Sequence, residues 1–162
     1  MSIERTIVIM MGVQGSGKST FYATHLAENF VRVNLDTLRT RNRERLLIEE
    51  CLAEGKSYAV DNTNPTRQDR ERYIPVAREH GYRVIGYLMQ TGVEHCLDRN
   101  RGREGKARVP DVAIYATARK LEHPTYAEGF DELYLVENDG AEMTVTPILR
   151  GCDDPMGVKN EN

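Results

Sequence analysis

The feature that most constrains the fold is a glycine-rich segment near the start of the chain, Gly12 to Ser19. It follows the apolar run Thr6 to Met11 and precedes the helix-compatible stretch Thr20 to Asn29. The segment has the G-x-x-x-x-G-K-S spacing of a P-loop, in the strand, loop and helix context that this motif requires. Backbone N–H groups of such a loop surround phosphate oxygens, and the positive end of the following helix points at the same place. We therefore expect phosphate binding through Gly12, Gly15, Ser16, Gly17, Lys18, Ser19 and Thr20.

Two side chains of this loop predict the cofactors. Lys18 would reach the β- and γ-phosphates of ATP, and the Ser19 hydroxyl would help to hold Mg²⁺. Loose glycine-rich turns between strands and helices are common, but here every fixed position of the motif matches. The loop alone does not say which group receives the phosphate.

Length and charge limit the classes to which the chain can belong. Its 162 residues fit a single P-loop kinase domain, predicted over residues 1–150, with a polar tail at 151–162. A net charge of −3 argues against coating of a long nucleic acid, so any such contact must be local. No stretch is long enough for a signal-peptide core or a membrane span. The scattered cysteines show no metal-ligand spacing, and we expect a cytoplasmic protein with no membrane contact.

Apolar strand-like segments alternate with helix-like segments along the chain. The predicted strands are Thr6–Met11, Phe30–Leu35, Ser57–Asp61, Arg83–Met89 and Glu132–Val136, with Met143–Leu149 as a further candidate. The predicted helices are 20–29, 37–54, 66–80, 93–100 and 110–121. This alternation predicts parallel pairing through right-handed crossovers. The expected fold is an α/β P-loop NTPase, an adenylate-kinase-like three-layer sandwich with a central parallel sheet of about five strands and an arginine-bearing lid.

Asp36 is the first candidate for a general base. Phosphoryl transfer needs a carboxylate that can accept the proton of the acceptor hydroxyl. Asp36 ends a predicted strand, so it should lie at the same sheet edge as the P-loop. An aspartate that opens a helix is also a common helix cap. The i, i+3 spacing of Asp36 and Arg39 predicts that both lie on one side of a helical turn, where they could hold a hydroxyl and a neighbouring phosphate of one acceptor. A simple ion pair is the alternative.

Asp61 is the second acidic candidate. It ends an apolar strand predicted to lie beside the P-loop strand, where P-loop enzymes carry an acidic residue that orders the water shell of Mg²⁺. We therefore expect Ser19 and Asp61 to form the metal site. Asn62 and Asn64 are expected to shape the following turn, because their side chains readily bond the local backbone.

A basic run between two predicted helices is the candidate lid. It contains Arg99, Arg101, Arg103, Lys106 and Arg108. A solvated charged face is the usual account of such a run. Here the glycines at 102 and 105 make the segment flexible, and arginine suits bidentate phosphate contacts. We expect one or two of these arginines, foremost Arg99 and Arg103, to contact the phosphates of ATP and stabilise the transition state.

Several of these segments together resemble a known family. They are Gly12 to Ser19, Leu35 to Arg39, Val60 to Pro65, Arg99 to Arg101 with Val109-Pro110, and Leu121 to Phe130. In this order they resemble the kinase domain of polynucleotide 5'-hydroxyl kinases, P-loop kinases of the AAA_33 type. The P-loop is shared by many enzymes. The Asp-Asn-Thr-Asn segment and the late Pro-Thr-x-x-Glu-Gly-Phe segment are much more specific when they occur together.

The resemblance implies a role for each matching position. Asp36 matches the general base for the acceptor 5'-OH, and Arg39 matches the arginine that binds the phosphate on the 3' side of the terminal nucleoside. Lys18 and Ser19 match the ATP and Mg²⁺ residues, and Asp61 matches an acidic strand-end position. Arg99 and Arg103 match lid arginines at the ATP phosphates. Such kinases are often fused to a phosphatase or a ligase, so we expect these repair partners as separate chains.

The expected function is an ATP- and Mg²⁺-dependent kinase that moves the γ-phosphate onto the 5'-OH end of RNA or DNA, in nucleic-acid end repair. The nearest alternative is a small-molecule kinase that acts on a nucleoside, sugar or antibiotic hydroxyl. That enzyme would keep Asp36 but would not need Arg39 to recognise a phosphate. A P-loop switch protein is a third alternative, and it would show nucleotide-dependent partner binding instead of acceptor-dependent ATP consumption.

Overall fold

A six-stranded sheet forms the centre of the protein. The computed structural model describes residues 4–138 and 142–151, and the predicted tail lies outside them except for Gly151. The strands lie in the order β2-β3-β1-β4-β5-β6. Their bounds are β1 Thr6–Met11, β2 Val31–Val33, β3 Tyr58–Val60, β4 Arg83–Gln90, β5 Glu132–Asn138 and β6 Met143–Pro147.

The first five strands run parallel, and β6 pairs with β5 in the antiparallel direction. The parallel core of the sheet is therefore confirmed, and the candidate strand near residue 143 is an antiparallel edge strand. Every residue of β1 is buried. Strands buried on both faces are typical of parallel sheets that carry helices on either side.

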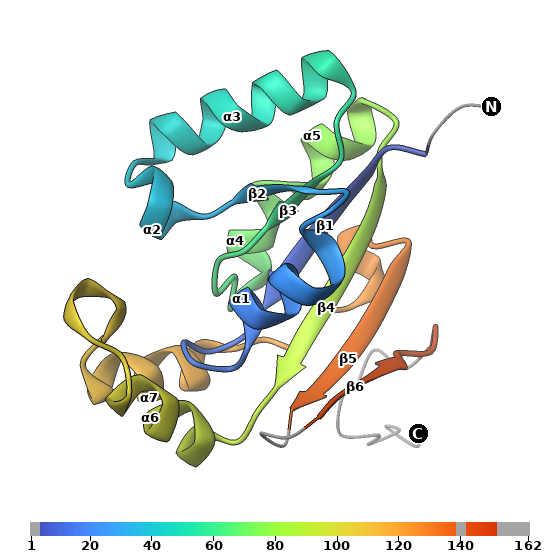
Figure 1. Cartoon of the computed structure of the whole chain (residues 1–162). Coiled ribbons are helices and arrows are strands. Elements are labelled where there is room, and N and C mark those ends of the chain that lie inside the picture. Colours follow the sequence, from blue (N-terminus) through green and yellow to red (C-terminus); the bar gives the residue numbers. More distant parts are fainter. Residues whose placement is uncertain (1–3, 139–141, 152–162) are drawn as a thin grey trace.

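Helices cover both faces of the sheet, which confirms the three-layer architecture (Figure 1). Phe21 and Leu26 pack on one face beside Val8 and Met10. Ile48, Cys51 and Ile74 pack on the other face with alternate β1 residues. The helices are α1 Lys18–Phe21 with a π-helical turn Tyr22–Leu26, α2 Leu35–Leu38, α3 Arg41–Glu54, α4 Arg67–Glu71, α5 Ile74–Glu79, α6 Val93–Arg101 and α7 Asp111–Lys120.

Two helices that the sequence predicted as continuous are interrupted. The segment 37–54 breaks at Arg39, whose φ of 74° ends α2, and Thr40 then caps α3 by accepting from the Arg43 N–H. The segment 66–80 breaks before Ile74, because Pro75 fits only the first turn of a helix. Thr66 and Asp69 form a capping box at the start of α4.

A buried ion pair connects α4 to residues 122–128, which lie far away in the sequence. Arg70 is fully buried and pairs with Glu128 at 2.7 Å. Its guanidinium also donates to the carbonyl oxygens of Asn64, Pro65 and Glu122. The turn that follows β3 is thereby fixed to residues 122–128. Among the described residues, no helix is both long and apolar enough to cross a membrane.

Candidate active site

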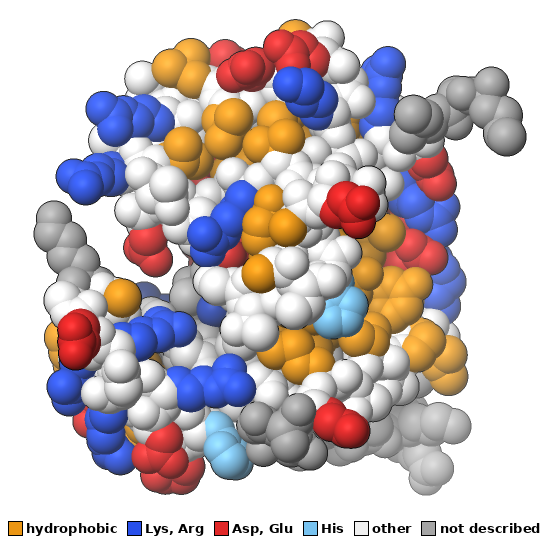
Figure 2. All heavy atoms as spheres, in the orientation of Figure 1, with side chains coloured by type: hydrophobic (Ala, Val, Ile, Leu, Met, Phe, Trp, Pro, Cys, Tyr) orange, Lys and Arg blue, Asp and Glu red, His pale blue; other side chains and the backbone are white. Residues whose placement is uncertain are grey.

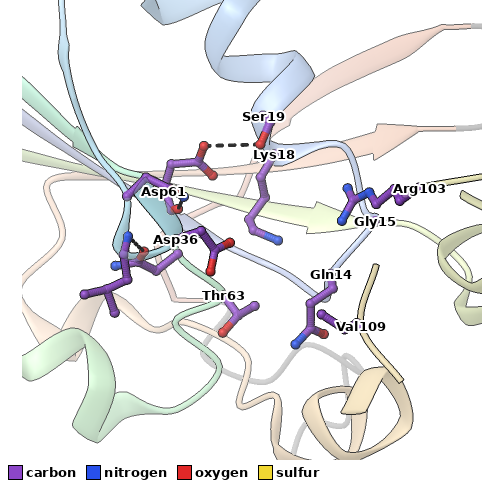
Figure 3. A pocket seen from close by; sticks show the side chains of 12 residues that line it. Gln14, Gly15, Lys18, Ser19, Asp36, Asp61, Thr63, Arg103 and Val109 are labelled. Atoms are coloured by element: carbon purple, nitrogen blue, oxygen red, sulfur yellow. Dashed lines mark hydrogen bonds between the residues drawn. The ribbon is translucent and has the colours of Figure 1, made fainter. Parts of the chain in front are cut away.

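A cavity of about 260 Å³ lies at the carboxyl edge of the sheet, where α6 and α7 extend beyond the ends of β1 and β4 (Figures 1 and 3). Parallel α/β sheets bind ligands at this edge. Its lining residues are Gln14, Gly15, Lys18, Ser19, Asn34, Leu35, Asp36, Asp61, Asn62, Thr63, Arg103 and Val109.

The P-loop has the backbone geometry of a phosphate cradle. Gly15 and Gly17 have φ values of 80° and 102°, a backbone conformation that residues other than glycine rarely adopt. A Cβ on Gly15 would also lie 2.8 Å from the Cys96 carbonyl oxygen. The Ser16 hydroxyl is buried and has no hydrogen-bond partner among the described residues. An unpartnered buried donor beside a row of backbone N–H groups fits a bound phosphate.

Lys18 is almost fully buried in the cradle, with 9% of its surface exposed. Its ammonium donates to the carbonyl oxygens of Gly12 at 3.0 Å and Val13 at 2.9 Å, so the loop folds around its own lysine. Burial lowers the pKa of Lys18 from the ordinary 10.5 to about 8, against the attraction of Asp61. Nearby Arg103 lowers the pKa further. A phosphate would supply the negative charge that this buried cation lacks.

This lowered pKa predicts that nucleotide binding depends on pH. A bound phosphate favours the charged ammonium, so nucleotide binding takes up a proton wherever free Lys18 is neutral. We expect ADP affinity to be constant below about pH 8 and to fall by up to about tenfold per pH unit above it. Calorimetric titration of ADP across this range, in buffers of different ionisation enthalpy, measures both the affinity and the proton uptake. A constant affinity through the alkaline range would contradict this assignment.

Asp36 faces the P-loop across the cavity, as predicted. It lies in the first turn of α2, and the N-cap is Asn34, whose side chain accepts from the Thr37 N–H. The Asn34 amide donates to the backbone of Asp61, and the Asn62 side chain accepts from the Leu35 N–H at 2.9 Å. In Figure 3, Asp36 and Lys18 point into the cavity from different walls. Two asparagines thus fix the short helix that carries the carboxylate, and Asp36 is not its cap.

Sequence reasoning missed Glu44, a buried residue that supports Asn62 and thereby the position of α2. Glu44 is 2% exposed and accepts hydrogen bonds from Asn62 at 3.0 Å and from the Tyr73 hydroxyl at 3.0 Å. Arg41 pairs with the same carboxylate at 2.9 Å. The network connects α3 to the turn after β3, one hydrogen bond away from α2. Glu44 gives no signal in the sequence, because it stands among charged residues of a helix that is otherwise largely exposed.

Arg39 lies elsewhere than the sequence spacing predicted. The expectation that it shares a helical turn with Asp36 is wrong, because the helix ends at Arg39. Its side chain is exposed and does not line the cavity. Arg39 therefore lies at the junction of α2 and α3, outside the cavity that Asp36 lines.

Ser19 and Asp61 meet as predicted, and a further residue joins them. The Ser19 hydroxyl lies 3.4 Å from the Asp61 carboxylate, whose side chain is 1% exposed. A hydroxyl and a carboxylate are the oxygen donors that Mg²⁺ prefers, and a metal held largely by water and phosphate needs few protein ligands. The described residues contain no group of three His, Cys, Asp or Glu side chains that could hold a metal ion. Arg32, which sequence reasoning missed, contacts both groups from β2.

The basic run divides between α6 and the loop that follows it. Arg103 lines the cavity near Gly15 (Figure 3). Arg99 reaches the P-loop from α6, with a guanidinium nitrogen 3.1 Å from the position of a Cβ on Gly17. Arg101 pairs instead with Asp98 at 3.1 Å. Both arginines singled out for the phosphates thus lie at the P-loop.

Of the remaining P-loop predictions, Gly12 lies beneath the cavity rather than in its lining, and its N–H donates to the Thr63 carbonyl at 2.9 Å. Thr20 is exposed at the start of α1. Asn64 shapes the turn, since its amide donates to the Met10 carbonyl at 2.8 Å and to the Asn62 carbonyl at 3.4 Å. The expectation that Asn62 bonds the local backbone is wrong, because its side chain bonds Leu35 and Glu44 and lines the cavity.

The family model described as an AAA domain, AAA_33, matches residues 7–124. A putative bifunctional polynucleotide phosphatase/kinase of Acanthamoeba polyphaga mimivirus is 31% identical over 140 residues, covering 82% of this chain and 33% of the relative. A bifunctional polynucleotide phosphatase/kinase of Schizosaccharomyces pombe is 30% identical over 133 residues, covering 80% and 33%. The chain thus spans about a third of the length of these relatives.

Solved structures share the fold. A fungal RNA kinase superposes with a TM-score of 0.64 at 12% identity, covering 88% of this chain and 41% of that one. A sugar kinase from Janibacter sp. HTCC2649 superposes with a TM-score of 0.61 at 19% identity, covering 82% and 85%. At these identities the likeness establishes the α/β P-loop architecture alone.

Proposed function

The chain belongs to the AAA_33 family of P-loop domains, and from this membership and its site we propose that it is an ATP- and Mg²⁺-dependent kinase that phosphorylates the 5'-OH end of RNA or DNA. The observation that carries the proposal is one cavity lined by the P-loop Lys18, the Asp36 carboxylate and Arg103. A phosphate donor site and a candidate base thereby face the same space. Phosphoryl transfer requires such an arrangement, because alignment and charge neutralisation supply most of its catalysis.

The residues divide the reaction between them. The acceptor oxygen attacks the γ-phosphorus in line, the bond to the β–γ bridging oxygen breaks, and ADP leaves. Asp36 accepts the proton of the attacking hydroxyl. Lys18 and Arg103 hold the charge that develops on the phosphoryl oxygens, and Arg99 binds the phosphates beside Gly17. The Ser19 hydroxyl and the Asp61 carboxylate would hold Mg²⁺, which when bound supplies neutralisation of the phosphate charge.

Two observations support a polynucleotide acceptor over a free small molecule. Relatives named polynucleotide phosphatase/kinase align over most of this chain. Around the acceptor side, Lys and Arg side chains lie on both sides of the hollow that opens between the α2 and α3 region and the α6 and α7 region (Figure 2). Exposed Arg39, Arg41 and Arg43 lie next to Asp36 along the chain. These positive side chains favour binding of a polyanion at this place, although the net charge of the whole chain is −3.

The deciding experiment is transfer of labelled γ-phosphate from ATP with Mg²⁺ to a 5'-OH oligonucleotide, to a 3'-mononucleotide and to free nucleosides, with Asp36→Ala as the control. Transfer to the first two, lost in the variant, is the expected result. Transfer to nucleosides or sugars alone would instead establish a small-molecule kinase. ATP hydrolysis that no acceptor stimulates would favour a P-loop switch.

Arg39 provides a test of the acceptor class. If it binds the phosphate on the 3' side of the terminal nucleoside, Arg39→Ala should lower kcat/KM for 3'-phosphorylated acceptors by about 10- to 100-fold, the usual effect of a charge-assisted hydrogen bond. Activity on acceptors without this phosphate should be unchanged. Arg45→Ala is the matched control, since Arg45 is exposed on the adjoining helix and pairs with exposed Glu49. Equal losses on both acceptor types would rule out phosphate recognition by Arg39.

We place this activity in cytoplasmic nucleic-acid end repair, together with phosphatase and ligase activities. Two relatives carry phosphatase in their names, and the matched segment covers 33% of each. A putative polynucleotide kinase/RNA ligase is matched over 19% of its length. The described cysteines, Cys51 and Cys96, are free and buried, as suits a reducing compartment.

A further inference from the structure

Arg32 lies where the metal site is expected to hold its cation. Its Nη2 lies 2.7 Å from Oδ2 of Asp61 and donates to the Ser19 hydroxyl at 3.0 Å. Its Nε donates to the same Asp61 oxygen at 2.9 Å. The Ser19 hydroxyl and the Asp61 carboxylate are the two protein groups assigned to Mg²⁺, and one guanidinium bonds to both.

The environment of Arg32 makes this contact strong but reversible. Asp61 is buried, so its charge needs a partner, and the bond to a guanidinium supplies one. The Arg32 side chain is 35% exposed, which leaves it a path toward solvent. It also lies over the ring of Tyr22, 5.6 Å from the ring centroid, and the Tyr22 hydroxyl is anchored on the Phe30 carbonyl at 2.6 Å. The ring already contacts the guanidinium in this position, so the cation keeps a partner there when it leaves Ser19.

We propose that Arg32 is a resident cation of the metal site, which holds Ser19 and Asp61 in the metal-free protein and leaves Ser19 when Mg²⁺ enters with the nucleotide. The inference rests on the proposed function, since it concerns the metal of that reaction. Two cations on one hydroxyl oxygen repel each other, and the repulsion is weakly screened beside a buried carboxylate. Arg32 thereby sets the concentration of Mg²⁺ that the protein requires.

A purely structural role for Arg32 makes the opposite prediction. If the guanidinium only orients Asp61 and Ser19, its removal disorders the metal ligands and weakens Mg²⁺ binding. If it competes with the metal, its removal strengthens Mg²⁺ binding, because the site keeps its carboxylate and loses a positive charge. The direction of the change therefore separates the two roles without reference to catalysis.

The test is calorimetric titration of ADP at increasing Mg²⁺ into the wild-type protein, Arg32→Gln and Arg45→Gln. The last variant removes the same charge from an exposed pair with Glu49 on α3. We expect Arg32→Gln to lower the Mg²⁺ concentration that gives half of the metal's effect on ADP affinity by about five- to tenfold, because one unit charge leaves a partly buried site. The Arg45→Gln value should equal that of the wild type. An unchanged or increased Mg²⁺ requirement in Arg32→Gln would overturn the proposal.

A spectroscopic measurement on the wild-type protein keeps the proposal testable if Arg32→Gln fails to fold. The Arg32 Nε–H is bonded to Asp61, so its resonance should be observable and distinct. It should shift when Mg²⁺ and ADP are added together and stay in place with ADP and a chelator. A resonance that both additions leave in place would contradict release from Ser19.

The two proposals fail in different ways. Mg²⁺-dependent ADP binding without transfer to any 5'-OH acceptor would overturn the acceptor assignment and leave the Arg32 inference standing. ADP binding that ignores Mg²⁺ in the wild-type protein would overturn both.

Discussion

Replacing Asp36 with asparagine is expected to lower phosphoryl transfer by about 10²- to 10⁴-fold, the range that a positioned general base contributes. Asparagine keeps the size of the side chain and its place in the first turn of α2, so the caps and the cavity should persist. It cannot accept a proton. The loss should therefore appear in kcat, with ADP affinity unchanged, because Asp36 lies on the acceptor side of the cavity.

Single-turnover transfer to a 5'-OH oligonucleotide, with ADP titration in parallel, measures both quantities. Asp69→Asn is a matched control, since Asp69 caps α4 and does not line the cavity. A comparable fall of ADP affinity in Asp36→Asn would assign Asp36 to the nucleotide instead. Transfer within a factor of about two of the wild type would exclude it as the base.

Lys18→Met is expected to affect activity and stability in opposite directions. Methionine fills the buried site without a charge, so transfer should fall by at least about 10²-fold, as for the loss of one transition-state donor. The unliganded protein should nevertheless gain stability near neutral pH, by about 1 kcal/mol once the lost bonds to the Gly12 and Val13 carbonyls are set against the relieved burial of charge. The P-loop lysine would thus be retained for function at the expense of stability.

The pH dependence of this gain tests its cause. The folded pKa of Lys18, about 8, lies below the ordinary 10.5, so the unfolded chain binds more protons between these values. The stabilising contribution of neutral Lys18 is complete above 10.5 and is lost as the pH falls through about 8. The advantage of Lys18→Met in denaturant unfolding should therefore be largest below about pH 8 and shrink as the pH rises above it. A difference that is constant with pH would mean that packing, and not charge, separates the two proteins.

The positions of the strands and the parallel pairing of the first five followed from sequence, because the signals are local and strong. Apolar runs such as Thr6–Met11 have no solvent-facing side, which restricts them to a parallel sheet with helices on both faces. The P-loop spacing and the strand ends then placed Lys18, Asp36 and Asp61 at one edge. The prediction of these positions needed only the rule that parallel strands end together.

The features that sequence did not predict depend on side chains from separate elements. Arg32 stands in the alternating pattern of an edge strand and gives no hint of its contact with Ser19 and Asp61. Glu44 is hidden in a charged helix, and its burial arises only when Asn62 and Tyr73 pack against it. The break at Arg39 depends on a positive φ that arginine rarely adopts. The helical periodicity of this segment shows no sign of it, so the predicted helix included Arg39.

The ion pair between Arg70 and Glu128 has a consequence for how this domain can be recombined with its relatives. The turn after β3 and residues 122–128 lie far apart in the sequence, yet Arg70 binds the backbone of both. A chimera whose donor segment lacks the matching residue would leave a buried guanidinium or carboxylate without its partner, which is strongly destabilising. The two segments should therefore be exchanged as one unit, with crossover points chosen outside both.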